Sequence, residues 1–116
     1  MSEIAIRVLN ILKMIDERTG VAELDRASQE ILRVIMIAHA SNETLCVGDL
    51  AKRADLGSAP SIYSKLKMLS EKGWIQSTPD KSDGRMRQVV PTKKAMNAFR
   101  RLSKELQLQL NPAVDQ

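Results

Sequence analysis

The chain is poor in the residue types that build disulfide, metal and catalytic sites. Its 116 residues include one cysteine, Cys46, and one histidine, His39. A lone cysteine excludes an internal disulfide and cannot form a thiolate metal site, which indicates a reducing compartment. The two residues stand seven positions apart and no glycine-rich phosphate loop accompanies them. We therefore predict a protein that is not an enzyme and that needs no cofactor or metal.

Aromatic residues and long apolar runs are also scarce. Trp, Tyr and Phe occur once each, so the core must be aliphatic. No run approaches the roughly 18 apolar residues of a membrane-spanning helix. The early Glu3 and the spaced apolar residues around it are not typical of a signal peptide. These features predict a cytoplasmic, globular protein with no membrane partner.

Positive charge is plentiful, and it is concentrated in one part of the chain. Residues 52–104 hold 13 Lys or Arg against 4 Asp or Glu, a local charge of +9, whereas the whole chain carries +4. Such a concentration is the electrostatic footprint of a protein that binds a polyanion. The alternative is a solvated basic face that has no partner.

Two helices are predicted in the first forty residues. Apolar residues at spacings of four and three favour a helix from Ser2 to about Arg18, with Thr19-Gly20 ending it. Asp25 is a candidate cap for a second helix through Ala40, and its apolar residues are dense enough for burial in the core. The residues expected to be buried there are Ile31, Leu32, Val34, Ile35, Ile37 and Ala38. Residues 43–46 can form only a minimal strand.

A helix-turn-helix follows from Val47. Residues 47–53 read as a short helix, and Asp55-Leu56-Gly57 supplies a sharp turn. Ser58 can then cap a second helix that runs to Lys72, where Gly73 stops it. One face of that helix carries Ile62, Leu66 and Leu69 and points to the core.

The exposed part of this second helix has the chemistry that a DNA major groove accepts. Hydroxyls can donate to and accept from base edges, and lysines can neutralise phosphates. The candidate contacts are Ser58, Pro60, Ser61, Tyr63, Ser64, Lys65 and Lys67.

Residues 73–92 predict a β-hairpin that ends at a helix cap. Trp74 and Ile75 should pack beneath it, and a polar tip contains Asp83-Gly84-Arg85. Arg85 and Arg87 share one side of the returning strand, where they can enter a minor groove or hold a phosphate. Asp83 would orient Arg85. An ordinary surface turn with an ion pair is the alternative.

Together these motifs resemble the MarR family of winged-helix transcription regulators. The resemblance covers about residues 27–100 and includes Leu50-Ala51-Lys52-Arg53, Glu71-Lys72-Gly73-Trp74-Ile75 and Asp83-Gly84-Arg85, with Thr92 as cap of the next helix. It implies a mainly α fold with a small β-hairpin wing, an α/β winged helix-turn-helix. Many members carry Thr-Arg in the recognition helix where this chain has Tyr63-Ser64.

The resemblance implies a homodimer that binds double-stranded DNA at a pseudo-palindromic operator, usually as a repressor. The recognition helix would lie in the major groove, and Arg85 would lie in the adjacent minor groove. Residues 27–92 would form the DNA-binding core of a single winged-helix domain spanning 1–116. The resemblance also allows a small-molecule effector, but no pattern of residues in the sequence indicates one.

The terminal helices, residues 1–20 and 93–111, are the predicted dimerisation region. Each has a continuous apolar stripe, and the first is wider than a surface helix needs for its own core. The residues assigned to the interface are Ile4, Val8, Ile11, Ile15, Phe99, Leu102 and Leu106. A monomer that buries both stripes internally is the alternative.

Two hypotheses about function remain from the sequence. The first is a dimeric DNA-binding regulator, and the second is a winged-helix module for protein interaction. Cys46 is better explained as a small buried or capping residue than as a redox sensor. His39 is better explained as closing a helix than as a metal ligand.

Overall fold

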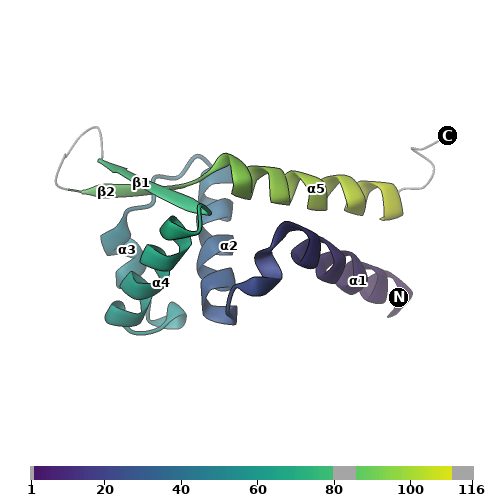
Figure 1. The fold of residues 1–116 in the computed structure, drawn as a ribbon, viewed down its shortest axis with the longest axis horizontal. Coiled ribbons are helices and arrows are strands. Elements are labelled where there is room, and N and C mark those ends of the chain that lie inside the picture. The colour runs from purple at the N-terminus through teal and green to yellow at the C-terminus, as the bar shows by residue number, and fades with distance from the viewer. Residues whose placement is uncertain (1, 80–85, 111–116) are drawn as a thin grey trace. The chain divides into compact units, whose positions relative to one another are not determined.

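A computed structural model describes residues 2–79 and 86–110 as a mostly helical chain with one antiparallel pair of strands (Figure 1). The predicted fold class is therefore confirmed. By its internal contacts the chain divides into two compact units, one made of residues 1–24 and 96–116 and the other of residues 25–95. The predicted DNA-binding core, residues 27–92, lies within the second unit.

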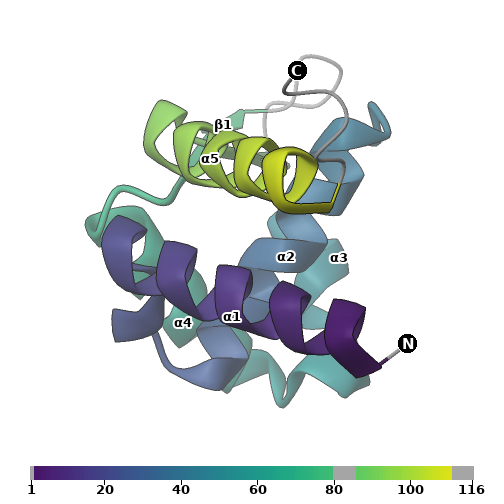
Figure 2. The same ribbon diagram turned by 90° about the vertical axis from the view of Figure 1, so that its right-hand side faces the viewer.

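The first unit contains helix α1 (Ser2–Thr19) and the short 3-10 helix η1 (Val21–Glu23). It also contains helix α5 (Lys93–Leu110), except for the first three residues of that helix, which belong to the second unit. In Figures 1 and 2, α1 and this part of α5 lie side by side. Helix α1 ends where predicted, because Gly20 adopts a φ of 92°, a conformation that residues with a side chain rarely take.

The apolar stripe of α1 is divided between the interior and the surface. Ile11 and Ile15 are buried by the chain itself, whereas Ile4 is 60% exposed. Ile6 and Leu9, which were not assigned to the interface, are also exposed. On a helix Leu9 lies about 200° from Ile11, so its side chain points away from the buried side. The surface of α1 thus carries apolar residues that its own chain does not cover.

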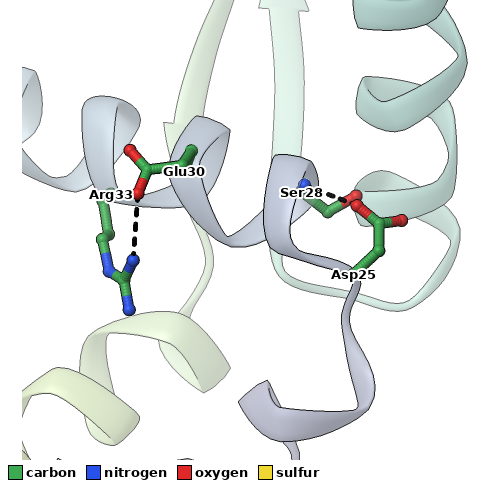
Figure 3. A network of polar contacts seen from close by, with 4 residues as sticks. All are labelled: Asp25, Ser28, Glu30 and Arg33. Carbon is green, nitrogen blue, oxygen red and sulfur yellow. Dashed lines mark hydrogen bonds and ion pairs between the residues drawn. The ribbon is translucent and has the colours of Figure 1, made fainter.

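The second unit begins with helix α2 (Arg26–Ala40), whose predicted cap is confirmed. The carboxylate Oδ1 of Asp25 accepts a hydrogen bond of 2.8 Å from the backbone N–H of Ser28 (Figure 3). Ile31, Leu32 and Ile35 form the buried side of the helix. An exposed ion pair between Arg33 and Glu30, 3.2 Å long, lies further along α2 (Figure 3).

Ile37 corrects the prediction for this helix. It was expected to be buried, yet it is 67% exposed. The run from Ile31 to Ala38 is almost continuously apolar, so composition alone conceals which positions face inward. At 100° per residue Ile37 lies about 200° from Ile35 and thus on the opposite side of the helix.

The helix-turn-helix consists of α3 (Val47–Ala51), the 3-10 helix η2 (Ala54–Leu56) and α4 (Ala59–Glu71). Gly57 between them has a φ of 124°, and Gly73, which terminates α4 as predicted, has a φ of 82°. Helix α3 ends at Ala51, two residues before the predicted end at residue 53, and η2 follows from Ala54. Apolar residues from both helices are buried in this unit: Leu50, Ile62, Leu66 and Leu69.

The wing is a hairpin of strands β1 (Ile75–Pro79) and β2 (Arg87–Pro91), paired antiparallel so that Ile75 lies opposite Pro91. The minimal strand predicted at residues 43–46 is confirmed as a single bridge between Cys46 and Gln88. Beside it, the N–H of Val89 donates to the carbonyl of Leu45 at 2.8 Å. Cys46 is buried, as expected.

Trp74 fixes the base of the wing. Its side chain is almost completely buried, and the ammonium of Lys94 lies 4.3 Å from its ring centroid. The hydroxyl of Thr92 donates to the carbonyl of Gly73, and the N–H of Ala95 donates back to that hydroxyl oxygen at 3.4 Å. Thr92 therefore caps α5 as predicted and also ties the start of α5 to the end of α4.

Candidate nucleic-acid interface

The start of α4 is fixed by its cap. The hydroxyl oxygen of Ser58 accepts a hydrogen bond of 3.3 Å from the N–H of Ser61, and Pro60 occupies the first turn, where no helical donor is lost. Ser58 and Pro60 are exposed, and Ser61 is half-buried. The hydroxyl oxygen of Ser58 thus already accepts a hydrogen bond from its own chain.

The middle of α4 presents three exposed residues of different chemistry. Tyr63 is 49% exposed, and Ser64 and Lys67 are exposed as well. Within the part of the chain that the structure describes, Lys67 forms no ion pair. This face therefore offers a phenol, a hydroxyl and an uncommitted ammonium to an outside partner.

Lys65 lies elsewhere on the helix. Its ammonium makes a 2.9 Å ion pair with the carboxylate Oδ2 of Asp25, the residue that caps α2. Lys65 is half-buried, unlike Lys67. The sequence assigned both lysines the same role, but the structure gives Lys65 a partner within its own chain.

The Asp25–Lys65 contact predicts a pH effect. The ammonium of Lys65 and then the N–H of Ser28 lower the pKa of the Asp25 carboxyl. Because this pKa is depressed on folding, the contact stabilises the fold fully at pH values above the pKa of an ordinary aspartate. That stabilisation is lost as the pH falls through the lowered pKa of Asp25 in the folded protein. We expect a carboxyl ¹³C NMR titration to show Asp25 titrating below ordinary aspartates. In Lys65→Gln the pKa should rise, and an unchanged pKa would contradict the contact.

The turn before α4 holds a second charged pair. The guanidinium of Arg53 donates to both carboxylate oxygens of Asp55, at 3.1 and 2.7 Å. The hydrogen bonds raise the pKa of Arg53 and lower the pKa of Asp55. Both side chains are exposed, so the pair fixes their orientation more than it stabilises the fold.

Arg87 is anchored across the wing. Its Nε donates to the hydroxyl of Ser77 at 2.9 Å, and its terminal nitrogen donates to the carbonyl of the same residue at 2.9 Å. The side chain is therefore held against β1 near the loop end of the hairpin, while its residue remains exposed. The other two predicted wing residues, Asp83 and Arg85, lie outside the described residues.

A hollow of about 350 Å³ lies between α4 and the wing. It brings Tyr63 of α4 together with Arg87 and with Met86, which is 42% exposed. Its remaining walls are Cys46, Val47 and Gly48. Sequence reasoning did not select Met86, although an apolar residue between two arginines in a polar hairpin was a usable signal. The hollow places an apolar surface beside a guanidinium.

Two further findings concern membrane spans and metal sites among the described residues. Over residues 2–79 and 86–110, no helix is long and apolar enough to cross a membrane. In the same ranges, no three His, Cys, Asp or Glu side chains gather in a way that could hold a metal ion.

Solved structures share this fold. A MepR mutant from S. aureus bound to an oligodeoxyribonucleotide matches all of this chain and 83% of its own, with a TM-score of 0.63 and 16% identity. A MarR mutant from E. coli complexed with operator DNA matches 97% of this chain and 79% of its own, with a TM-score of 0.54 and 17% identity. YusO from Bacillus subtilis matches 98% of this chain and 72% of its own, with a TM-score of 0.57 and 16% identity.

These similarities show that the chain has a MarR-type winged-helix fold. No family model matches the sequence, and a search of curated proteins found no match.

Proposed function

We propose that this protein is a sequence-specific double-stranded DNA-binding regulator that works as a cytoplasmic homodimer and represses transcription. The observation that carries the proposal is the exposed face of α4, which presents Tyr63, Ser64 and Lys67, with Tyr63 lining a hollow shared with Arg87 of the wing. The fold adds support, since two of the structures that share it were solved with DNA.

The helix α4 would enter the major groove by its N-terminal half. Ser64 can donate to or accept from a base edge, and Tyr63 adds a phenol that reaches further. Lys67, one turn along from Tyr63, would hold a phosphate and contribute affinity without choosing a sequence. The opposite face of α4 is packed into the unit by the buried residues Ile62, Leu66 and Leu69.

The wing would hold the neighbouring part of the duplex. Arg87 is oriented by Ser77 and would face a phosphate near the recognition helix. Arg85, assigned from the sequence to the minor groove, would extend the contact, with Asp83 orienting it. This division assigns specificity to α4 and anchoring to the wing.

The dimer would form through the first unit. Ile4, Ile6 and Leu9 of α1 and Leu108 and Leu110 of α5 are large apolar residues that remain exposed. Exposed apolar side chains gathered in one unit are typical of a protein–protein contact. Two copies joined here would read two half-sites about 34 to 36 Å apart, one turn of DNA.

DNA binding should depend strongly on salt, and Lys67 should account for part of that dependence. We expect Lys67→Ala to weaken binding to all duplexes about equally and to reduce the slope of log K against log salt by about 1. Fluorescence anisotropy on duplexes selected from a random pool, at several salt concentrations, measures both quantities.

Lys13→Ala is the matched control, because Lys13 is an exposed lysine in the other unit. Its affinity and slope should stay close to those of the wild type. If the wild-type chain binds no duplex, or binds with no salt dependence, the proposal is rejected. A stable complex with a different protein would then favour a winged-helix interaction module.

A further inference from the structure

The carboxylate of Asp25 serves two helices at once. Its Oδ1 accepts a hydrogen bond from the N–H of Ser28 and so caps α2. Its Oδ2 accepts a hydrogen bond from the ammonium of Lys65 on α4, 40 positions along the chain. The cap fixes the direction of the carboxylate, so Oδ2 is presented to Lys65 as a ready-made anionic partner. One residue outside the recognition helix thus holds the ammonium of a residue within it.

The contact is open to exchange. The side chains of Lys65 and Asp25 remain 30% and 46% exposed, so water and dissolved anions reach the pair. Ion pairs this exposed are weak, and a competing anion can replace one partner at low cost. A DNA phosphate is such an anion, and transferring a lysine to it releases a counterion from the duplex.

We infer that Asp25 is a further determinant of DNA affinity: its carboxylate occupies the ammonium of Lys65 in the free protein, and a backbone phosphate displaces it on binding. This inference rests on the proposed function. Asp25 touches no DNA in this scheme. It acts through Lys65, and it lowers the affinity because each binding event must first break the contact.

The substitution Asp25→Asn separates the two tasks of the residue. Asparagine caps a helix as well as aspartate does, so the bond to Ser28 is kept while the charge that holds Lys65 is removed. We expect Asp25→Asn to bind duplex DNA about threefold more tightly, the size of effect that an exposed ion pair can produce.

Two comparisons isolate this effect from a general gain in positive charge. In a Lys65→Gln background, Asp25→Asn should tighten binding no more than Asp49→Asn does, because no ammonium remains to be released. Asp49→Asn removes an exposed carboxylate that forms no ion pair within the described residues, and it should tighten binding less than Asp25→Asn does. Circular dichroism melting of each variant confirms that the fold is kept.

The outcomes distinguish the inference from the function on which it rests. Wild-type binding with a threefold gain in Asp25→Asn that falls to the level of Asp49→Asn in the double variant supports it. Wild-type binding with no gain beyond that of Asp49→Asn, or with the full gain retained without Lys65, overturns the inference and leaves the DNA-binding function standing. Absence of wild-type binding to any selected duplex rejects both.

Discussion

Leu9→Asp should convert the proposed dimer into a monomer and weaken binding to a two-half-site duplex by roughly 10²- to 10⁴-fold. Leu9 is 60% exposed on the side of α1 that its own chain does not bury. A carboxylate there would have to lose its water against apolar residues of the second copy, which costs far more than the contact gains. The loss of affinity follows because a monomer binds one half-site and forfeits the effective concentration supplied by the other.

Asn10→Asp is the matched control for this variant. It adds the same charge at the next position, which is also exposed, but points about 100° away and removes no apolar group. Sedimentation velocity gives the mass of each variant, and anisotropy on whole and half operators gives the affinities. A Leu9→Asp protein that remained dimeric and bound normally would exclude this face of α1, and a monomeric wild type would exclude the dimer altogether.

Trp74→Ala should destabilise the fold by about 3 to 5 kcal/mol. Trp74 is among the largest fully buried side chains of the described residues, and it lies where the end of α4, the start of β1 and the start of α5 meet. The substitution leaves a cavity and removes the ring that supports Lys94. Thermal unfolding followed by circular dichroism should show the melting temperature falling by roughly 10 °C or more.

Tyr63→Ala provides the contrast, because it removes an aromatic ring that is half exposed. Its melting temperature should change little, while its DNA affinity should fall. If the two aromatic variants melted alike, the core at the base of the wing would not depend on Trp74 as described.

Local sequence signals predicted the elements of this fold well. Asp25, Ser58 and Thr92 were identified as caps, and each accepts the expected backbone hydrogen bond. Gly20 and Gly73 end their helices through positive φ angles. These features depend on a few neighbouring residues, so a single sequence contains the information that determines them.

Contacts between distant residues could not be predicted in the same way. The ion pair of Lys65 with Asp25 and the bonds of Arg87 to Ser77 depend on which elements pack together, and side-chain spacing does not reveal that. Ile37 was placed wrongly because its dense apolar surroundings conceal the helical period. Helical spacing can place Lys65 on a flank of α4, but it cannot show that the carboxylate of Asp25, 40 positions away, lies beside it.

The bridge between Cys46 and Gln88 also affects how copies of this protein behave at high concentration. Exposed strand edges invite pairing with other chains and lead to aggregation. Here the outer side of β2 is partly occupied by Leu45 and Cys46, and β1 is short and ends at Pro79, which has no N–H to donate. The described strands therefore leave little free edge with which another copy could pair, which lowers the tendency of the protein to aggregate through strand addition.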